Sequence, residues 1–196
     1  MSAGSGATVL TAGKQTFGER LTGVIRLESW VFRDIARDPH AMWQALLVVA
    51  LAALANGLGH IGGGFGGFIG GIVAALVGWG VFCVAAWLIG QRLAPWSAPP
   101  PSRLVRLVGF AQAPKLIAAL GFLPLVGWFF GAAAALLALI VAIVALRIAF
   151  EIDFIRAIAI GVAAIVVSEI VLFVLQTIFG LGGVVIGALA FIGRPF

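Results

Sequence analysis

The chain of 196 residues is 63% hydrophobic and only 10% charged, and its mean hydropathy is +1.21. Soluble domains are about half apolar and a quarter charged, so this composition excludes a water-soluble globular domain and predicts an all-α protein that spans a lipid bilayer. Although the pI is about 11.1, the basic residues lie in short clusters between apolar runs, which argues against a nucleic-acid partner.

The N-terminal part of the chain precedes the apolar runs. Residues 1–15 are small and polar and lack the apolar core of a cleavable signal peptide, so we expect a flexible tail. Apolar residues recur at helical spacing over 16–40, which predicts one amphipathic helix on the membrane surface or a docking face for a cytosolic protein. The candidate partner or membrane surface of this arm consists of Arg20, Arg26, Trp30, Arg33 and Arg37.

Long apolar runs occupy the rest of the chain. A membrane-spanning helix needs about 20 apolar residues, and five runs come close to or exceed that length. We interpret 41–196 as one membrane domain, and the segment after the fifth run either continues its helix or lies at the interface. The five predicted spans cover about 41–58, 65–89, 104–123, 126–150 and 155–180.

The distribution of charge predicts the orientation of these spans. Basic residues precede the first run, separate the second from the third and bracket the link between the fourth and fifth, whereas the other connections carry no charge. The positive-inside rule therefore predicts a cytoplasmic N-terminus and an exterior C-terminus. Of the twelve lysines and arginines, only Lys115 and Arg194 fall elsewhere.

The second run opens with many glycines. Their small-xxx-small spacing lets helices approach closely, and it favours packing on another span or on a second copy of the chain. A phosphate-binding loop is the weaker interpretation, because no strand precedes the glycines and no Lys–Ser/Thr pair follows them. The two predicted packing faces are Gly62, Gly66, Gly70 and Gly63, Gly67, Gly71.

Two ionisable residues lie at similar depth inside predicted spans. Lys115 falls about halfway along the third run, and Glu169 about halfway along the fifth. A lone charge at the bilayer centre costs about 2.5–3.5 kcal/mol on insertion scales, so we predict that the two side chains pair.

Other polar residues surround this predicted pair. Pro114 frees a backbone carbonyl about one turn earlier, and Gln112, Ser168 or water could satisfy it. The cluster is interpreted either as a set of polar contacts that fixes how the helices pack or as a site for an ion, a proton or a lipid headgroup.

The sequence offers no recognisable catalytic set. His40 and His60 fall near opposite membrane surfaces, and the single cysteine lies inside an apolar run. No Ser–His–Asp or HExxH arrangement is present at a sensible spacing, so we predict no enzymatic activity, no metal and no cofactor.

The stretch "LVRLVGFAQAPKLIAALGFLPLVGW" resembles the central signature of Yip1-domain membrane proteins, and "RDPHAMWQALLVVALAALANGLG" resembles the first span of bacterial members. The resemblance covers roughly 25–180, and Gly109, Phe110 and Pro114 match its signature. It implies five membrane helices with a cytoplasmic N-terminus. Eukaryotic members are linked to Rab GTPases, Golgi membranes and vesicle traffic, but this chain has no tyrosine and lacks their acidic–Tyr–Gly-Pro motif.

These observations predict a multi-pass protein of a cell membrane, expected to be a bacterial inner membrane. We expect a scaffold that organises membrane or recruits a membrane or cytosolic protein through its arm. The alternative is a small transporter or channel subunit that uses Lys115 and Glu169. Besides the bilayer and such a protein, a second copy of the chain is a candidate partner.

Overall fold

The protein folds as a bundle of helices. The computed structural model describes residues 16–123 and 127–192, and every regular element in these ranges is a helix. The tail predicted for 1–15 lies outside the described residues. In chain order the elements are α1 (Phe17–Ile25), α2 (Ser29–Arg37), α3 (Ala41–Gly59), η1 (Ile61–Gly63), α4 (Gly64–Leu93), η2 (Pro95–Ser97), α5 (Pro101–Phe110), η3 (Ala113–Phe122), α6 (Gly127–Phe150) and α7 (Phe154–Ile192).

Four described helices are long and apolar enough to cross a membrane. They coincide with the first, second, fourth and fifth predicted runs. Because α7 runs on to Ile192, the segment after Gly180 continues the last helix as far as that residue. The four candidate spans are Ala41–Gly59, Ile61–Leu93, Phe129–Phe150 and Phe154–Ile178.

The third predicted run is not one continuous α-helix. The α-helix α5 ends at Phe110, and the ten-residue 3-10 helix η3 begins at Ala113. Pro114 has no N–H to donate and disfavours the α conformation of the residue before it, so the α-helical hydrogen bonds stop here. At about 1.5 and 2.0 Å per residue, α5 and η3 are about 15 and 20 Å long, so neither alone crosses a hydrocarbon core of about 30 Å.

The N-terminal arm forms two helices where the sequence predicts one. A capping box starts α1, since Thr16 and Glu19 exchange side-chain and backbone hydrogen bonds of 2.8 and 3.4 Å. The chain then turns at Leu27, whose φ is +59°. A Cβ on Gly23 would lie 2.5 Å from a methyl carbon of Val31, so the absence of a side chain lets the two helices meet at this corner. The prediction of a single helix over 16–40 is therefore wrong.

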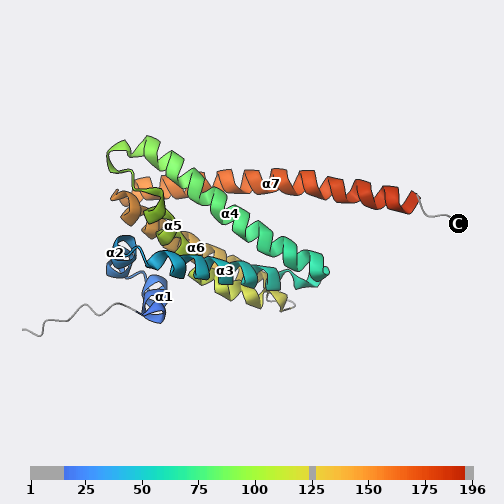
Figure 1. Ribbon diagram of the computed structural model, residues 1–196, viewed down its shortest axis with the longest axis horizontal. Coiled ribbons are helices and arrows are strands. Elements are labelled where there is room, and N and C mark those ends of the chain that lie inside the picture. Colours follow the sequence, from blue (N-terminus) through green and yellow to red (C-terminus); the bar gives the residue numbers. More distant parts are fainter. Residues whose placement is uncertain (1–15, 124–126, 193–196) are drawn as a thin grey trace, which may run out of the picture.

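The membrane helices pack around the broken segment. In Figure 1, α3, α5 and α6 lie together, and α4 crosses α7 beside them. The fully buried core combines large rings such as Phe110 and Phe150 with many alanines, including Ala86 and Ala145. Small side chains at helix crossings let backbones approach closely, which supplies the van der Waals contact that holds helices together in lipid.

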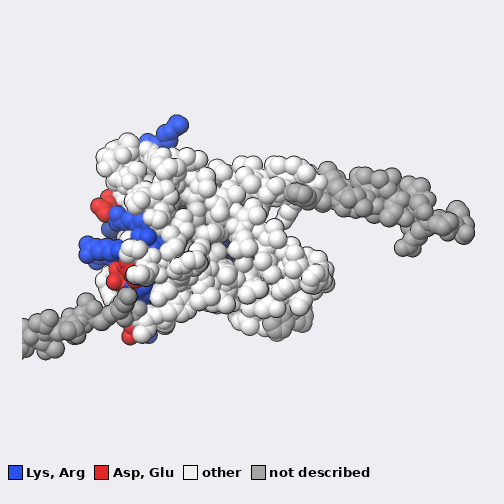
Figure 2. Space-filling model, viewed as in Figure 1, with Lys and Arg blue, Asp and Glu red and all other residues white. Residues whose placement is uncertain are grey.

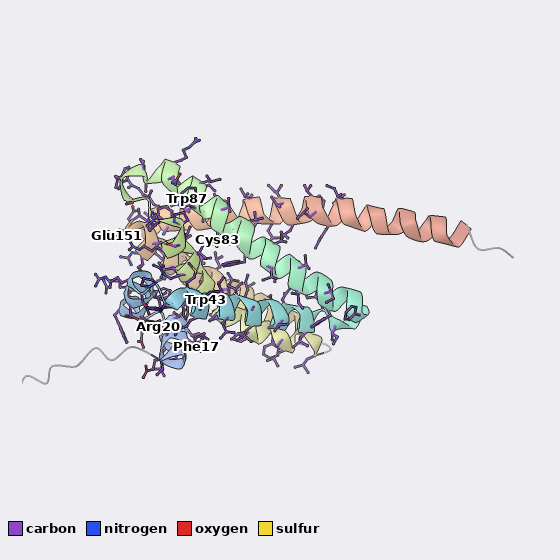
Figure 3. All side chains as sticks on the ribbon, viewed as in Figure 1. Phe17, Arg20, Trp43, Cys83, Trp87 and Glu151 are labelled. Carbon is purple, nitrogen blue, oxygen red and sulfur yellow. The ribbon has the colours of Figure 1, made fainter. Side chains whose placement is uncertain are left out.

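Charge and apolar surface are separated along the molecule. The visible charged side chains gather at the end where α1 and α2 lie, and the labelled Arg20 and Glu151 belong to this end (Figures 2 and 3). Large apolar side chains elsewhere are open to the surroundings, and Trp43 and Phe65 are 78% and 80% exposed. This arrangement suits lipid around the helices and water at the charged end.

Candidate functional site

A cavity opens among the membrane helices. Its volume is about 770 Å³, and residues of α3, α4, α6, α7 and the start of η3 line it. Alanine and other apolar residues form most of the wall. Within the described ranges, no group of three His, Cys, Asp or Glu side chains is placed to hold a metal ion. The polar and amphipathic lining residues are Asn56, His60, Trp79, Gln112, Lys115, Ser168 and Glu169.

Lys115 and Glu169 face this same cavity but do not form the direct pair that the sequence predicts. Lys115 is half-buried on η3, and Glu169 is exposed on α7. Their charges attract each other, yet no ion pair of 4.0 Å or less joins them among the described residues. Both side chains therefore line one cavity without a direct contact between them.

The other predicted polar residues are placed by local hydrogen bonds. The backbone N–H of Lys115 donates to the carbonyl of Gln112 at 2.9 Å, which closes the turn around Pro114. The Ser168 hydroxyl donates to the carbonyl of Ala164 at 2.8 Å within α7, so it does not satisfy a carbonyl freed by the proline. The side chain of Gln112 is buried and makes no hydrogen bond to another described residue. It is therefore available to a molecule in the cavity.

Three further residues of the cavity wall were not predicted from the sequence. Asn56 donates to the carbonyl of Gly71 at 2.8 Å and joins α3 to α4. His60 contacts the carbonyl of Asn56 through Nδ1 at 2.8 Å. The Nε1 of Trp79 is buried without a hydrogen-bond partner in the described part of the chain. The only sequence signal was the presence of polar atoms in apolar runs, because their common cavity depends on how α3 and α4 pack.

The residues of the predicted family signature fix α5 within the bundle. A Cβ on Gly109 would lie 2.9 Å from the Cβ of Ala45, so glycine lets α5 approach α3 at this point. Phe110 is fully buried, and its ring centroid lies 6.4 Å from that of Phe17 in α1. With Pro114 ending the α-helical segment, these residues determine where α5 packs and where it breaks.

The glycines that open α4 divide into packed and open positions. A Cβ on Gly71 would lie 3.0 Å from the Cα of Gly57, and a Cβ on Gly67 would collide with the carbonyl of His60. Gly71 therefore packs on α3, and Gly67 packs on the residue that follows this helix. The predicted packing by the other glycines does not occur within the described chain, because an added Cβ would meet nothing within 4 Å at Gly62, Gly63, Gly66 and Gly70.

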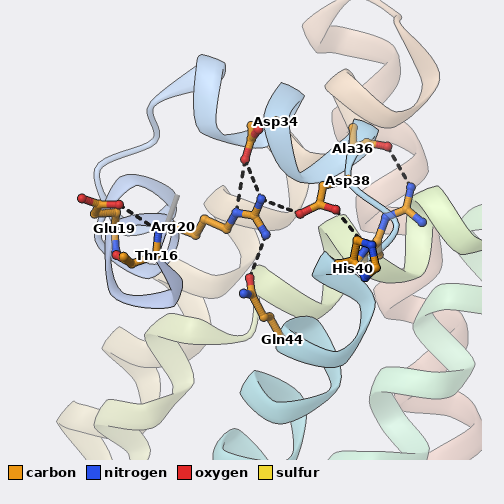
Figure 4. Close-up of polar contacts among 9 residues, drawn as sticks. Thr16, Glu19, Arg20, Asp34, Ala36, Asp38, His40 and Gln44 are labelled. Carbon is orange, nitrogen blue, oxygen red and sulfur yellow. Dashed lines mark hydrogen bonds and ion pairs between the residues drawn. The ribbon is translucent and has the colours of Figure 1, made fainter. Parts of the chain in front are cut away.

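Arg20 ties the arm to the membrane domain and is not the surface residue that the sequence predicts. Its side chain is only 3% exposed. The guanidinium donates to Asp34 at 2.9 and 3.2 Å, to Asp38 at 2.7 Å and to Gln44 at 2.8 Å (Figure 4). One side chain thus connects α1 with α2, with the residue that follows α2 and with α3.

Hydrogen bonds in the arm also shift the pKa values of two of its carboxylates. Hydrogen bonding to Arg20 lowers the pKa of Asp38 below its ordinary value. The backbone and side-chain hydrogen bonds of Thr16 lower the pKa of Glu19, which is fully exposed. Both carboxylates therefore remain charged at neutral pH, where they hold the arm and cap its first helix.

The other predicted surface residues of the arm are exposed. Arg26, Trp30, Arg33 and Arg37 all lie at the surface, so the structure separates them from Arg20. Two apolar residues at the corner between α1 and α2 join them. The exposed fraction is 51% for Ile25, 38% for Leu27 and 55% for Trp30.

Helices long and apolar enough to span a bilayer, with charge at one end, define a multi-helix membrane protein. A family model that describes the Yip1 domain matches residues 23–176, so the chain belongs to the Yip1 family. The match includes α2 and the corner of the arm as well as the membrane helices. No curated protein and no solved structure gives a significant match.

Proposed function

We propose that this Yip1-family protein is a membrane-organising scaffold that recruits a cytosolic protein through its arm. The observation that carries the proposal is the buried Arg20 network, which makes the arm a fixed part of the membrane domain. A surface held in one position costs less conformational entropy on binding than a loose segment does.

The recruiting surface consists of the exposed corner and the start of α2, namely Ile25, Arg26, Leu27 and Trp30. A large aromatic ring beside aliphatic side chains and a guanidinium is typical of an interface centre. The partner that fits has an apolar patch bordered by carboxylates. The chemistry of this role is binding alone, with no catalytic step.

The orientation required by this role follows from the positive-inside rule. We propose that the charged end is cytoplasmic, that α5 and η3 form a fifth span and that the C-terminus is exterior, in a bacterial inner membrane. A reporter enzyme that is active only outside the cytoplasm, fused after Phe196, tests this topology. Activity supports five spans, and inactivity together with a normally inserted protein supports four.

Co-purification in native lipid discs followed by mass spectrometry tests recruitment. We expect a stoichiometric protein partner on the wild type, which is lost in Arg26→Glu with Trp30→Ala and retained in the control Arg92→Glu. Arg92 is an exposed arginine near the end of α4, away from the corner. A disc that carries no partner protein, or a partner that survives the double change, contradicts the proposal.

A second function is favoured by the cavity of about 770 Å³ and its charged lining. Lys115, Glu169 and the unbonded Gln112 side chain could bind a small ion or polar molecule during transport. Flux across proteoliposomes that is lost in Lys115→Met and in Glu169→Gln supports a transporter. A scaffold predicts the opposite order of sensitivity to mutation. It tolerates Lys115→Met and loses its partner when the arm is changed.

A further inference from the structure

A second cavity lies at the charged end of the molecule, separate from the one inside the membrane. Its volume is about 610 Å³, and it lies between α2, α5 and the end of α6. Along α2 the lining residues recur at helical spacing, so one face of the helix forms a wall. Neither Arg26 nor Trp30 lines it, which makes this cavity independent of the proposed recruiting surface.

Arginine dominates the lining. Arg33 and Arg37 come from α2, Arg103 from α5 and Arg147 from α6, and the one acidic lining residue is Glu151. Four guanidinium groups against one carboxylate leave an excess of three positive charges. Such an excess in one concave site raises the local positive potential and attracts an anion.

The unused hydrogen-bond donors of these arginines also favour an anionic ligand. Arg103 donates to Glu151 and to the carbonyl of Ile148, both at 2.9 Å, but its Nε is buried with no hydrogen-bond partner in the described ranges. The side chains of the exposed Arg33, Arg37 and Arg147 make no hydrogen bond or ion pair with another described residue. The cavity therefore holds three guanidinium groups with free donors and a fourth with an unsatisfied N–H.

We propose that this cavity binds the phosphate of an anionic phospholipid headgroup. The planar donor fork of arginine matches the oxygens of a phosphate and binds them in pairs. A phospholipid phosphate carries one negative charge, or up to two in phosphatidic acid, and it presents more acceptor oxygens to the arginine donors than a carboxylate does. The volume lies within the range of about 300–1,000 Å³ that is usual for small-molecule sites.

The position of the cavity favours a lipid over a soluble phosphate. The lining residues of α6 lie at the end of a candidate membrane span, which is the level of the headgroups. Val144, Ile148 and Ile152 add an apolar wall beside the arginines. A headgroup with attached hydrocarbon contacts both surfaces, whereas a free phosphate contacts only the charged one. Basic pockets between membrane helices bind acidic headgroups by this principle.

Titration of the delipidated full-length protein with phosphatidic acid, phosphatidylglycerol or phosphatidylcholine, followed by native mass spectrometry, tests the proposal. We expect one tightly bound phosphatidic acid or phosphatidylglycerol and at least tenfold weaker binding of phosphatidylcholine. Arg33→Gln with Arg147→Gln should weaken binding of the acidic lipid at least tenfold. Arg33→Lys should weaken it less, because charge remains while the donor fork is lost.

Arg92→Gln is the matched control, since it removes an exposed arginine of α4 that does not line the cavity. Its lipid binding should equal that of the wild type. Equal binding of acidic and neutral lipids, or an equal loss in the control, overturns the proposal. If pyrophosphate displaces the lipid at a concentration similar to that of the lipid, the cavity binds a soluble phosphate compound. That result contradicts the proposal of a lipid ligand.

Discussion

The guanidinium of Arg20 in α1 lies 2.7 Å from the carboxylate of Asp38, eighteen residues later and just before the first membrane span. The same guanidinium also donates to Asp34 and Gln44. Because its side chain is almost fully buried, these partners supply the stabilisation that water does not. The contact therefore adds a buried polar attachment to the apolar packing that places the arm on the membrane domain.

Replacing Arg20 by methionine should loosen the attachment of the arm. Removing one partner of a buried ion pair costs about 3–5 kcal/mol, and we expect the lower end because Asp34 and Asp38 are partly exposed and regain water. Thermal unfolding in detergent should show the lower stability, and limited trypsin digestion should cut the arm faster. The control Arg26→Met removes an exposed arginine and should change stability by no more than about 0.5 kcal/mol. Equal behaviour of the two variants would show that the network does not hold the arm.

Acid should weaken the same attachment. Hydrogen bonding to Arg20 lowers the pKa of Asp38 below the ordinary 3.8, so the folded protein binds a proton less readily than the unfolded chain. The stabilisation is complete above that ordinary value and is lost as the pH falls through it towards the lower folded pKa. Unfolding temperatures measured between pH 6 and pH 3 should fall more steeply for the wild type than for Asp38→Asn.

Glu19 requires its own control in this experiment, because contacts with Thr16 also lower its pKa. The variant Glu19→Gln should keep the part of the pH dependence that belongs to Asp38. If Asp38→Asn has the same pH profile as the wild type, the acid response arises elsewhere.

The apolar runs could be predicted from sequence because hydropathy is a local property. Four of the five predicted spans correspond to candidate membrane helices, and Pro114 marks the break in the remaining one. The two-helix arm was not predicted, because the turn at Leu27 uses a positive φ in a residue type that rarely adopts it.

The membrane cavity and the Arg20 network could not be predicted from the sequence alone, because both depend on tertiary structure. The partners of Arg20 lie 14 to 24 residues away, so a helical pattern could not separate this buried arginine from its exposed neighbours. The predicted residues of the membrane cavity do meet there, with the exception of Pro114. The prediction of a direct contact between Lys115 and Glu169 was wrong, because similar depth in two helices does not set the direction of the side chains.

Neutralising Lys115 should leave the fold intact. No described residue forms an ion pair or a side-chain hydrogen bond with it, so Lys115→Met removes a poorly solvated charge without breaking a direct contact. We expect the stability of Lys115→Met to equal or exceed that of the wild type. In a double-mutant cycle with Glu169→Gln, the coupling energy should stay below about 1 kcal/mol, because no direct contact joins the two charges. A coupling energy of about 3 kcal/mol or more would show that the two side chains do form a direct ion pair.

The close approach of α3 and α4 should depend on Gly71 and not on its neighbour. A Cβ on Gly71 would lie 3.0 Å from the Cα of Gly57 and 3.1 Å from the carbonyl oxygen of Asn56, which are backbone atoms that cannot rotate away. Gly71→Val should therefore separate the helices, break the hydrogen bond from Asn56 and cost about 1–3 kcal/mol. Gly70→Ala is the matched control, because nothing lies within 4 Å of the added carbon and alanine favours a helix. Unfolding temperatures in detergent should fall for the first variant alone. An equal fall for both would mean that the loss comes from the glycine backbone and not from the contact with α3.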